Sequence, residues 1–253
     1  MRREDLLAAF HDAAPGLDIE VVDSCASTNA LLLARAQQGA ASGLAIIARE
    51  QTAGRGRQGR AWVSAPGDSL TFSLLWRFAA GTPLSGLSLA IGVAVAEALE
   101  AFAPGAPLLL KWPNDVLRDG GKLAGILIEL SGRNAAVIGV GINLRLPAAL
   151  PDDVRATAAA LPDGTGDVAA LAAVLTAMAA VCRRFDGVGF APWQAAFAAR
   201  DAMRDRPVQL LAPPAPPRVG TARGVDADGA LRLETDGAIH AVVAGELSLR
   251  PAP

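Results

Sequence analysis

Apolar residues recur along the first two hundred positions with two different spacings, which predict strands and helices. Short apolar runs bounded by turn residues predict strands at 19–22, 44–49, 69–76, 108–111, 116–117, 122–130 and 136–140. Apolar residues three or four positions apart predict helices at 1–16, 30–39, 85–102, 167–185 and 191–203. Ser85 and Asp167 stand where helix N-caps are expected, and the segment 147–167 is expected to be irregular.

The run Ser69–Trp76 alternates polar and apolar residues, which predicts a strand with one buried face and one polar face. Asp119-Gly120-Gly121 separates two strand-like runs and predicts a hairpin. Beyond residue 205, short strand-like runs alternate with turn pairs such as Asp228-Gly229 and Asp236-Gly237. We therefore expect a large domain at 1–205 and a small antiparallel barrel at 206–253.

Composition and charge exclude several classes of protein. Hydrophobic residues make up 52% of the 253 positions and charged residues 19%, which is ample for a buried core. The formal net charge of −2 gives no global attraction for nucleic acid or an anionic membrane. Two cysteines and two widely separated histidines do not predict a metal site. Because the start of the chain lacks a signal peptide's apolar core, we expect a cytoplasmic protein.

The segment Gly54-Arg55-Gly56-Arg57-Gln58-Gly59-Arg60, which we call the arginine–glycine loop, holds three glycines and three arginines. Glycine allows the backbone to approach a ligand closely, and arginine offers a permanently charged fork of donors. The combination predicts a clamp for phosphate or carboxylate. Its glycines also fit a dinucleotide-binding fingerprint, but a turn and a strand follow instead of a helix. A solvated segment or an RNA-binding arginine–glycine tract is a further alternative.

The segment Ser27-Thr28-Asn29 precedes the predicted helix at 30–39. These residues are typical of helix N-caps, which satisfy the free amide groups of the first turn. Their hydroxyl and amide groups are equally able to bind a neutral polar group of a ligand. The residues alone leave both interpretations open.

Four blocks in order resemble the biotin–protein ligases, also called biotin–[acetyl-CoA-carboxylase] ligases. The blocks are Ser27-Thr28-Asn29; Gln51 with Gly54–Arg60, Ala61 and Trp62; Lys111-Trp112-Pro113-Asn114-Asp115; and Gly121-Lys122-Leu123-Ala124-Gly125-Ile126-Leu127 with Gly139-Val140-Gly141-Ile142-Asn143. The ending Gly245-Glu246-Leu247-Ser248-Leu249-Arg250 resembles the close of that family's C-terminal SH3-like domain. The resemblance covers nearly the whole chain.

The resemblance implies an α+β fold: a catalytic domain like that of class II aminoacyl-tRNA synthetases, with a mixed sheet and flanking helices, plus a small SH3-like β-barrel. It implies that biotin and MgATP form biotinyl-5′-adenylate and pyrophosphate, and that a lysine of a biotin carboxyl carrier protein domain then takes the biotin. Such chemistry depends on positioning and on stabilising charge.

The resemblance also implies roles for individual residues. Ser27, Thr28 and Gln51 would meet the ureido end of biotin, and Arg57 and Lys122 would hold its carboxylate and later the adenylate phosphate. Further positive charge would come from Arg55, Arg60 and Lys111; Asn114, Asn143 and Arg250 would lie toward the nucleotide; and Asn29, Gly54, Gly56, Trp62, Gly125 and Gly141 complete the expected site. Asp115 would orient or deprotonate the acceptor lysine, unless it only caps the turn after Pro113-Asn114.

Two departures from the family pattern limit what the resemblance implies. Only 26 residues precede Ser27, which is too few for the family's N-terminal DNA-binding domain, so we expect no role on DNA. The segment 146–161 lacks the aromatic residues expected of an adenine-covering loop. A lipoate or octanoate ligase and a non-enzymatic carrier-domain or nucleic-acid binding module are the alternatives, and the sequence allows a monomer or a homodimer.

Overall fold

The computed structural model describes residues 4, 8 and 16–252, except 106, 133, 149, 213–214 and 246. The helix predicted for residues 1–16 lies outside the described residues, apart from Glu4 and Ala8, which are helical, and Gly16, which lies in a turn.

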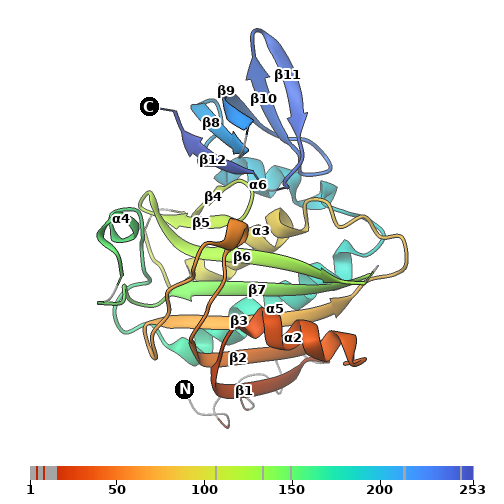
Figure 1. The fold of residues 1–253 in the computed structure, drawn as a ribbon, viewed down its shortest axis with the longest axis vertical. Helices are drawn as coiled ribbons and strands as arrows, with labels where there is room; N and C mark the ends of the chain where they lie inside the picture. Colours follow the sequence, from red (N-terminus) through yellow and green to blue (C-terminus); the bar gives the residue numbers. More distant parts are fainter. Residues whose placement is uncertain are drawn as a thin grey trace.

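A seven-stranded mixed sheet forms the centre of the molecule (Figure 1). Its strands follow the order β1 (Asp18–Cys25), β2 (Leu44–Gln51), β3 (Ser69–Arg77), β7 (Ala135–Asn143), β6 (Gly121–Ser131), β5 (Asp115–Arg118) and β4 (Leu109–Lys111). Only β1 and β2 pair in parallel, and helix α2 (Thr28–Gln37) connects them. All other neighbours pair antiparallel. The expected mixed sheet with flanking helices is confirmed.

Helices cover both faces of this sheet, so the molecule has three layers (Figure 1). On one face, Leu32 and Ala36 of α2 pack against Ile46, Leu75 and Val137. On the other face, the main hydrophobic core includes the buried sides of α3 (Leu87–Glu100) and α5 (Asp167–Phe185). By length and composition alone α5 could cross a membrane, but 56% of its most apolar stretch is buried inside the protein. Helix α5 is therefore part of the core.

Strand β3 corrects the expectation of a half-buried strand. Every residue from Ser69 to Leu75 is buried, including the polar Ser73 and Thr71. The polar face of β3 is turned toward α2 and not toward water, since Ser73 Oγ lies 2.7 Å from Thr28 Oγ1. Alternating polarity therefore marks an internal polar layer at this position.

The helices differ from expectation mainly at their ends. Helix α3 begins at Leu87, and its N-cap residue is Gly86, with a left-handed φ of 74°. The cap predicted at Ser85 is therefore one residue too early. Helix α5 begins at Asp167 as the sequence indicates, but Gly166 occupies the N-cap position. The helix expected at 191–203 divides into a 3-10 turn, Ala191–Trp193, and α6 (Gln194–Arg200). The segment expected to be irregular contains one short helix, α4 (Asp152–Arg155).

A second, five-stranded antiparallel sheet lies beside the β4 end of the large sheet (Figure 1). Its order is β11 (Ala238–Val242), β10 (Leu231–Thr235), β9 (Ala215–Val225), β8 (Pro207–Ala212) and β12 (Ser248–Pro251). The buried indole of Trp112 donates from Nε1 to the carbonyl oxygen of Gly229 at 3.2 Å. A Cβ on Gly229 would lie 2.7 Å from the Cα of Gly86, so glycine is required where the two parts touch.

Candidate functional site

Strand register brings distant motifs into one line across the sheet. Ala48, Thr71, Gly141, Gly125, Asp115 and Lys111 are successive pairing partners from β2 to β4. Paired residues share a face of a sheet, so all six side-chain positions lie on the face that α2 partly covers. A second line of pairing partners lies two residues along each strand, on the same face, and contains Ile46, Ser73, Gly139 and Leu127. The motifs of β5, β6 and β7 therefore meet on one surface.

Glycines on β6 and β7 form a floor on which the ring of Trp62 rests. A Cβ on Gly141 would lie 2.4 Å from Cε2 of Trp62, and one on Gly125 would lie 3.2 Å from Cζ3. Such contacts leave no room for any side chain beneath the indole. The indole nitrogen is buried with no hydrogen-bond partner among the described residues. The ammonium of Lys122 lies 5.7 Å from the ring centroid, within range of a cation–π interaction.

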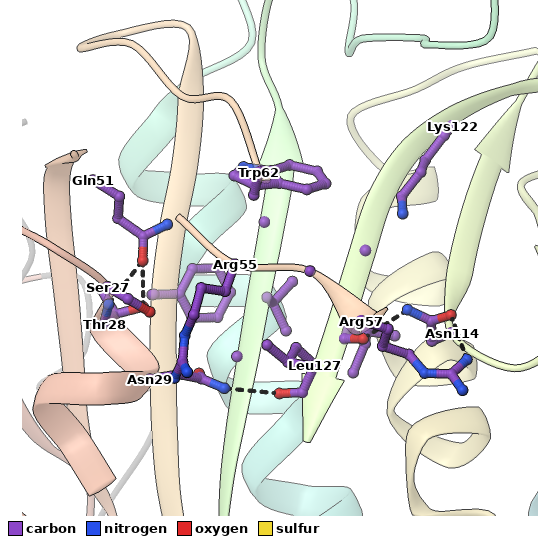
Figure 2. A pocket seen from close by; sticks show the side chains of 17 residues that line it. Ser27, Thr28, Asn29, Gln51, Arg55, Arg57, Trp62, Asn114, Lys122 and Leu127 are labelled. Carbon is purple, nitrogen blue, oxygen red and sulfur yellow. Dashed lines mark hydrogen bonds between the residues drawn. The ribbon is translucent and has the colours of Figure 1, made fainter. Parts of the chain in front are cut away.

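One end of the site is polar and uncharged, and α2 builds it. Ser27 and Thr28 are 4% and 3% exposed. The backbone nitrogen of Thr28 donates to Oε1 of Gln51 at 2.7 Å, and the hydroxyl of Thr28 lies 3.1 Å from the same oxygen. This fixes the amide of Gln51 so that its nitrogen points away from α2 (Figure 2). Ser27 makes no side-chain cap bond to α2, so the N-cap interpretation is only positional for this residue.

Asn29 continues the polar layer beneath this end. Its Oδ1 lies 2.6 Å from the hydroxyl of Ser73, and its Nδ2 donates to the carbonyl oxygen of Leu127 at 3.2 Å (Figure 2). A Cβ on Gly139 would lie 2.2 Å from Oδ1 of Asn29. Sequence reasoning missed Ser73, and it included Gly139 in a family block without assigning it to the site. The polar positions of 69–73 and the two-residue spacing of Gly139 and Gly141 were the available signals.

Positive charge gathers at the opposite end. Asp115 lies between two lysines: its Oδ1 is 2.6 Å from the ammonium of Lys122, and its Oδ2 is 3.4 Å from that of Lys111. The side chain of Asp115 is only 13% exposed. A carboxylate removed from water in this way is costly unless it is paired, and the two lysines provide that pairing. Asp115 begins β5 and contacts two cations, which is more than a turn cap requires.

Arg57 joins the arginine–glycine loop to both sheets. It donates to Oδ1 of Asn114 at 3.3 Å and to the carbonyl oxygen of Gly245 in the small sheet's last turn. Asn114 in turn donates to the carbonyl oxygen of Ile126 at 2.8 Å. Removal from water lowers the pKa of Arg57, Asp115 opposes that shift, and Arg60 adds to it. A guanidinium nevertheless keeps its charge, and a partly desolvated cation gains strongly from a bound anion.

The loop itself folds back on its own ends. Arg55 and Ala61 form an isolated bridge, and the backbone nitrogens of Gly56 and Trp62 donate to the carbonyl oxygens of Arg60 and Gly54 at 2.7 and 2.9 Å. A Cβ on Gly54 would lie 2.5 Å from the carbonyl oxygen of Trp62, which explains that glycine. A short 3-10 turn, Arg57–Gly59, lies within the motif, and no α-helix starts there. The dinucleotide-binding alternative therefore fails.

Arg55 has a different partner from Arg57. Its Nη2 lies 3.1 Å from both carboxylate oxygens of Glu129, and Oε2 of Glu129 also accepts from Nδ2 of Asn29 at 2.8 Å. Arg60 contacts Oε1 of Gln58 at 2.6 Å and the hydroxyl of Ser248 at 3.1 Å. Sequence reasoning missed Glu129, since nothing in its local pattern separates it from an ordinary exposed strand residue.

These elements enclose a cavity. It is lined by Ser27, Thr28, Asn29, Gln51, Arg55, Gly56, Arg57, Trp62, Phe72, Asn114, Lys122, Gly125, Ile126, Leu127, Gly139, Val140 and Gly141. Figure 2 shows Ser27, Thr28, Asn29 and Gln51 at one side, Lys122 and Arg57 at the other, and Trp62 between them. Arg55, which pairs with Glu129, lies beside Asn29 on the first side. With Trp62 in place, only about 50 Å³ is open to a water-sized sphere, which holds a few water molecules.

Six of the predicted site residues lie outside this lining: Gly54, Arg60, Lys111, Asp115, Asn143 and Arg250. The amide nitrogen of Asn143 donates to the carbonyl oxygens of Lys122 and Ala159 at 3.2 and 2.9 Å. Arg250 is exposed on β12 in the small sheet. The structure thus brings most predicted residues together. Five of these six contact residues of the lining, whereas Arg250 lies on the small sheet.

Comparisons with known proteins agree with this arrangement. Residues 21–143 match the Biotin/lipoate A/B protein ligase family, and residues 205–250 match the Biotin protein ligase C terminal domain. The chain is 38% identical over 245 residues to the bifunctional ligase/repressor BirA of Escherichia coli, covering 94% of this chain and 75% of the relative. It is 37% identical to the biotin--[acetyl-CoA-carboxylase] ligase of Mycobacterium tuberculosis, covering 90% of this chain and 88% of the relative.

A solved structure extends the likeness to three dimensions. Biotin protein ligase from Aquifex aeolicus, in complex with biotin and ATP, superposes with a TM-score of 0.81 and 29% identity, covering 93% of this chain and 99% of that one. The sequence matches and the fold point to the same group of proteins. This chain belongs to the biotin protein ligase family.

Proposed function

We infer that this chain is an ATP-dependent ligase that activates biotin as biotinyl-5′-adenylate and transfers it to a lysine of a carrier protein. The relatives of Mycobacterium tuberculosis and Paracoccus denitrificans are named biotin--[acetyl-CoA-carboxylase] ligases, and the Aquifex structure holds biotin and ATP. The carrier partner is accordingly the biotin carboxyl carrier domain of a biotin-dependent carboxylase.

The observation that carries this proposal is the sequence of environments along the cavity. Uncharged hydrogen-bonding groups line one end, glycines and the ring of Trp62 line the middle, and the cations Arg57 and Lys122 line the other end. Biotin has the same order: a neutral ureido group, an apolar ring and chain, and a carboxylate. A ligand is recognised best when each polar group finds a partner and each apolar part finds apolar surface.

At the polar end, we propose that Ser27, Thr28 and Gln51 bind the ureido group. Gln51 offers an amide nitrogen as donor to the ureido oxygen, since its own oxygen is held by the backbone of Thr28. The hydroxyl of Ser27 has no hydrogen-bond partner among the described residues and remains available. Asn29 holds this end of the cavity in place through its hydrogen bonds to Leu127 and Ser73.

At the charged end, we propose that Arg57 and Lys122 hold the biotin carboxylate against the α-phosphate of ATP. Two anions must approach each other before pyrophosphate leaves, and fixed cations lower the barrier by stabilising the charge that develops. Lys111 and Arg60 add positive potential from outside the cavity lining. Asn114, Asn143 and Arg250 belong to the nucleotide side, with Oδ1 of Asn143 free of hydrogen bonds among the described residues.

Magnesium enters this proposal with the nucleotide. Among the described residues, no group of three or more His, Cys, Asp or Glu side chains could hold a metal ion. Mg²⁺ commonly keeps its waters and binds through substrate phosphates and one or two carboxylates. We therefore treat MgATP as the substrate.

In the transfer step, we propose that Asp115 orients the acceptor lysine and receives its proton. The amine must be neutral to attack the acyl carbon, and the adenylate phosphate leaves as AMP. Asp115 adjoins Lys122, so a carboxylate lies beside the cation that would hold the phosphate. Its pairing with Lys111 keeps it anchored while Lys122 contacts the substrate.

The lipoate or octanoate alternative is disfavoured by the same cavity. An aliphatic acyl chain carries no hydrogen-bonding group to meet Ser27, Thr28 and Gln51, which would leave buried polar groups unpaired. A non-enzymatic binding module would have no use for a cavity with a cationic end and a neutral polar end.

Several broader features stay proposals. We propose domains at 1–205 and 206–253, the first related to class II aminoacyl-tRNA synthetases and the second an SH3-like barrel, consistent with two sheets joined near Pro207. We also propose that the protein is cytoplasmic and acts as a monomer or homodimer. The formal net charge of −2 supports the further proposal that it does not bind DNA.

Biotin-dependent exchange of labelled pyrophosphate into ATP tests the proposed function. Exchange should require biotin and magnesium and should not occur with lipoate or octanoate. Robust exchange with lipoate and none with biotin would overturn the assignment.

A further inference from the structure

Glu129 lies beside the cavity without lining it. It follows Leu127 by two positions on β6, so both side chains are on the face of the sheet that carries the site. The carboxylate has two partners, Arg55 in the arginine–glycine loop and Asn29 at the start of α2. Glu129 therefore joins the loop to the helix that builds the polar end of the cavity.

Asn29 depends on this carboxylate. It is 3% exposed, and its amide hydrogens go to the carbonyl oxygen of Leu127 and to Glu129, while its oxygen meets the hydroxyl of Ser73. These partners determine which way the amide of Asn29 faces. If the carboxylate of Glu129 moved away, a buried donor would lose its partner, which proteins avoid.

The hydrogen bonds continue from Asn29 to the start of the loop. Ser73 also lies within hydrogen-bond distance of Thr28, and Thr28 contacts Gln51, the last residue of β2. The loop is thus attached to one network at two points: at Gln51, three residues before the loop begins, and through Arg55 to Glu129. In Figure 2 the side chain of Arg55 extends toward Asn29 and away from Lys122.

We propose that Glu129 is a positioning residue that latches the arginine–glycine loop over the cavity through Arg55, so that Arg55 serves closure and not direct binding of the substrate anions. The inference rests on the proposed function, and it divides the loop's arginines between two tasks. Arg57 faces the cationic end of the cavity, whereas Arg55 is neutralised by Glu129. A closed loop keeps water from the adenylate until the carrier lysine arrives.

An ordinary surface ion pair provides a matched control. Exposed pairs contribute little on average, so exposure alone would predict no effect. The side chains of Arg55 and Glu129 are 46% and 27% exposed, and those of Arg223 and Glu234 in the small sheet are 40% and 30% exposed. The pairs differ in two ways: Glu129 also accepts from the buried Asn29, and Arg223 has a second carboxylate partner, Asp205, at 2.7 Å.

The first experiment measures how long the enzyme retains its intermediate. The adenylate complex is formed with biotin and labelled MgATP, isolated, and followed for loss of label in wild type, Glu129→Gln, Arg55→Gln, the double variant and Glu234→Gln. We expect roughly tenfold faster loss in each single variant at the site, equivalent to ~1.4 kcal/mol. The double variant should lose label no faster than either single variant, because both substitutions open the same latch.

The same variants should separate closure from chemistry. Pyrophosphate exchange at saturating biotin and ATP should fall much less than adenylate retention does for Glu129→Gln, because no atom of Glu129 lines the cavity. Glu234→Gln should match wild type in both assays. The latch is refuted if Glu129→Gln retains the adenylate as long as wild type. It is also refuted if Arg55→Gln abolishes exchange while Glu129→Gln does not, which would make Arg55 a direct anion ligand.

A second experiment needs no substrate and so separates this inference from the proposed function. Ligand-free protein is digested with trypsin, and cleavage after Arg57 and Arg60 is followed by mass spectrometry. Glu129→Gln should be cut several-fold faster in the loop than wild type or Glu234→Gln. Equal rates would overturn the latch even if biotin activation were confirmed, and faster cutting would support it even if wild type formed no adenylate.

Discussion

Replacing Lys122 by alanine should impair adenylate formation while leaving the fold intact. The side chain makes its contacts at the cavity: its ammonium lies 2.6 Å from Asp115 and 5.7 Å from the centre of the Trp62 ring. The backbone makes separate contacts, donating to the carbonyl oxygen of Thr157 at 2.8 Å and accepting from Ala159 at 2.9 Å. Removing the side chain therefore takes away a charge and spares the strand.

The size of the effect follows from the role we assign to the ammonium. One charge-assisted contact to a developing anion in a closed site stabilises the transition state by about 2–4 kcal/mol. That corresponds to a loss of roughly 30-fold to 1,000-fold in kcat/KM for pyrophosphate exchange. A further loss is expected because Asp115, only 13% exposed, would keep Lys111 alone as its cationic partner.

Lys111→Ala is the matched control. Both lysines contact Asp115, but only Lys122 lines the cavity. We expect Lys111→Ala to lose less than tenfold in pyrophosphate exchange, because Lys111 lies outside the cavity lining and the Asp115 that it anchors acts in the later transfer step. Circular dichroism and urea midpoints show whether each variant is folded. A folded Lys122→Ala enzyme with near-normal exchange, or one no worse than Lys111→Ala, would refute this reasoning.

Three further predictions rest on other parts of the structure. Gly139→Ala should destabilise the protein by about 1–3 kcal/mol in urea unfolding, since its Cβ would lie 2.2 Å from Oδ1 of Asn29; an unchanged midpoint would contradict this contact. Burial raises the pKa of both Cys25 and Cys182, which lowers the fraction of reactive thiolate at neutral pH. Because Cys182 is buried and Cys25 is only partly so, alkylation should modify Cys25 first and Cys182 only after the protein unfolds. Because Trp62 packs directly on Gly125 and Gly141 in the floor of the cavity, we expect residues 54–62 to rearrange around biotin, and tryptic cleavage there should slow when biotin and MgATP are present.

The sequence predicted the elements of the large sheet because its strands are short apolar runs between strong turn signals. It also predicted most of the cavity, since Ser27, Gln51, Lys122 and the glycines lie in blocks that resemble one family in order. What it could not supply was register. That Gly125 lies between Gly141 and Asp115 follows from pairing of strands, which no local pattern determines.

The misjudged features have the same origin. Ser73 belongs to an alternating run that is typical of a solvent-facing strand, and only the position of α2 makes its polar face internal. Glu129 is ordinary in the sequence and becomes significant through Asn29 and Arg55, which are 100 and 74 positions away. The pairing of Arg55 with Glu129 was equally out of reach of the sequence, and the predicted contribution of Arg55 to the positive charge of the site stays a prediction.

The most direct test of this account is a single-turnover measurement of adenylate formation and discharge. Protein is incubated with ATP labelled at the α-phosphate, magnesium and biotin, freed of small molecules, and then mixed with a biotin carboxyl carrier domain. We predict that about one labelled adenylate per chain is retained only when biotin is present, and that the carrier domain releases the label as AMP while one of its lysines gains biotin. Equal retention with lipoate or octanoate, or retained label that the carrier domain fails to discharge, would contradict it.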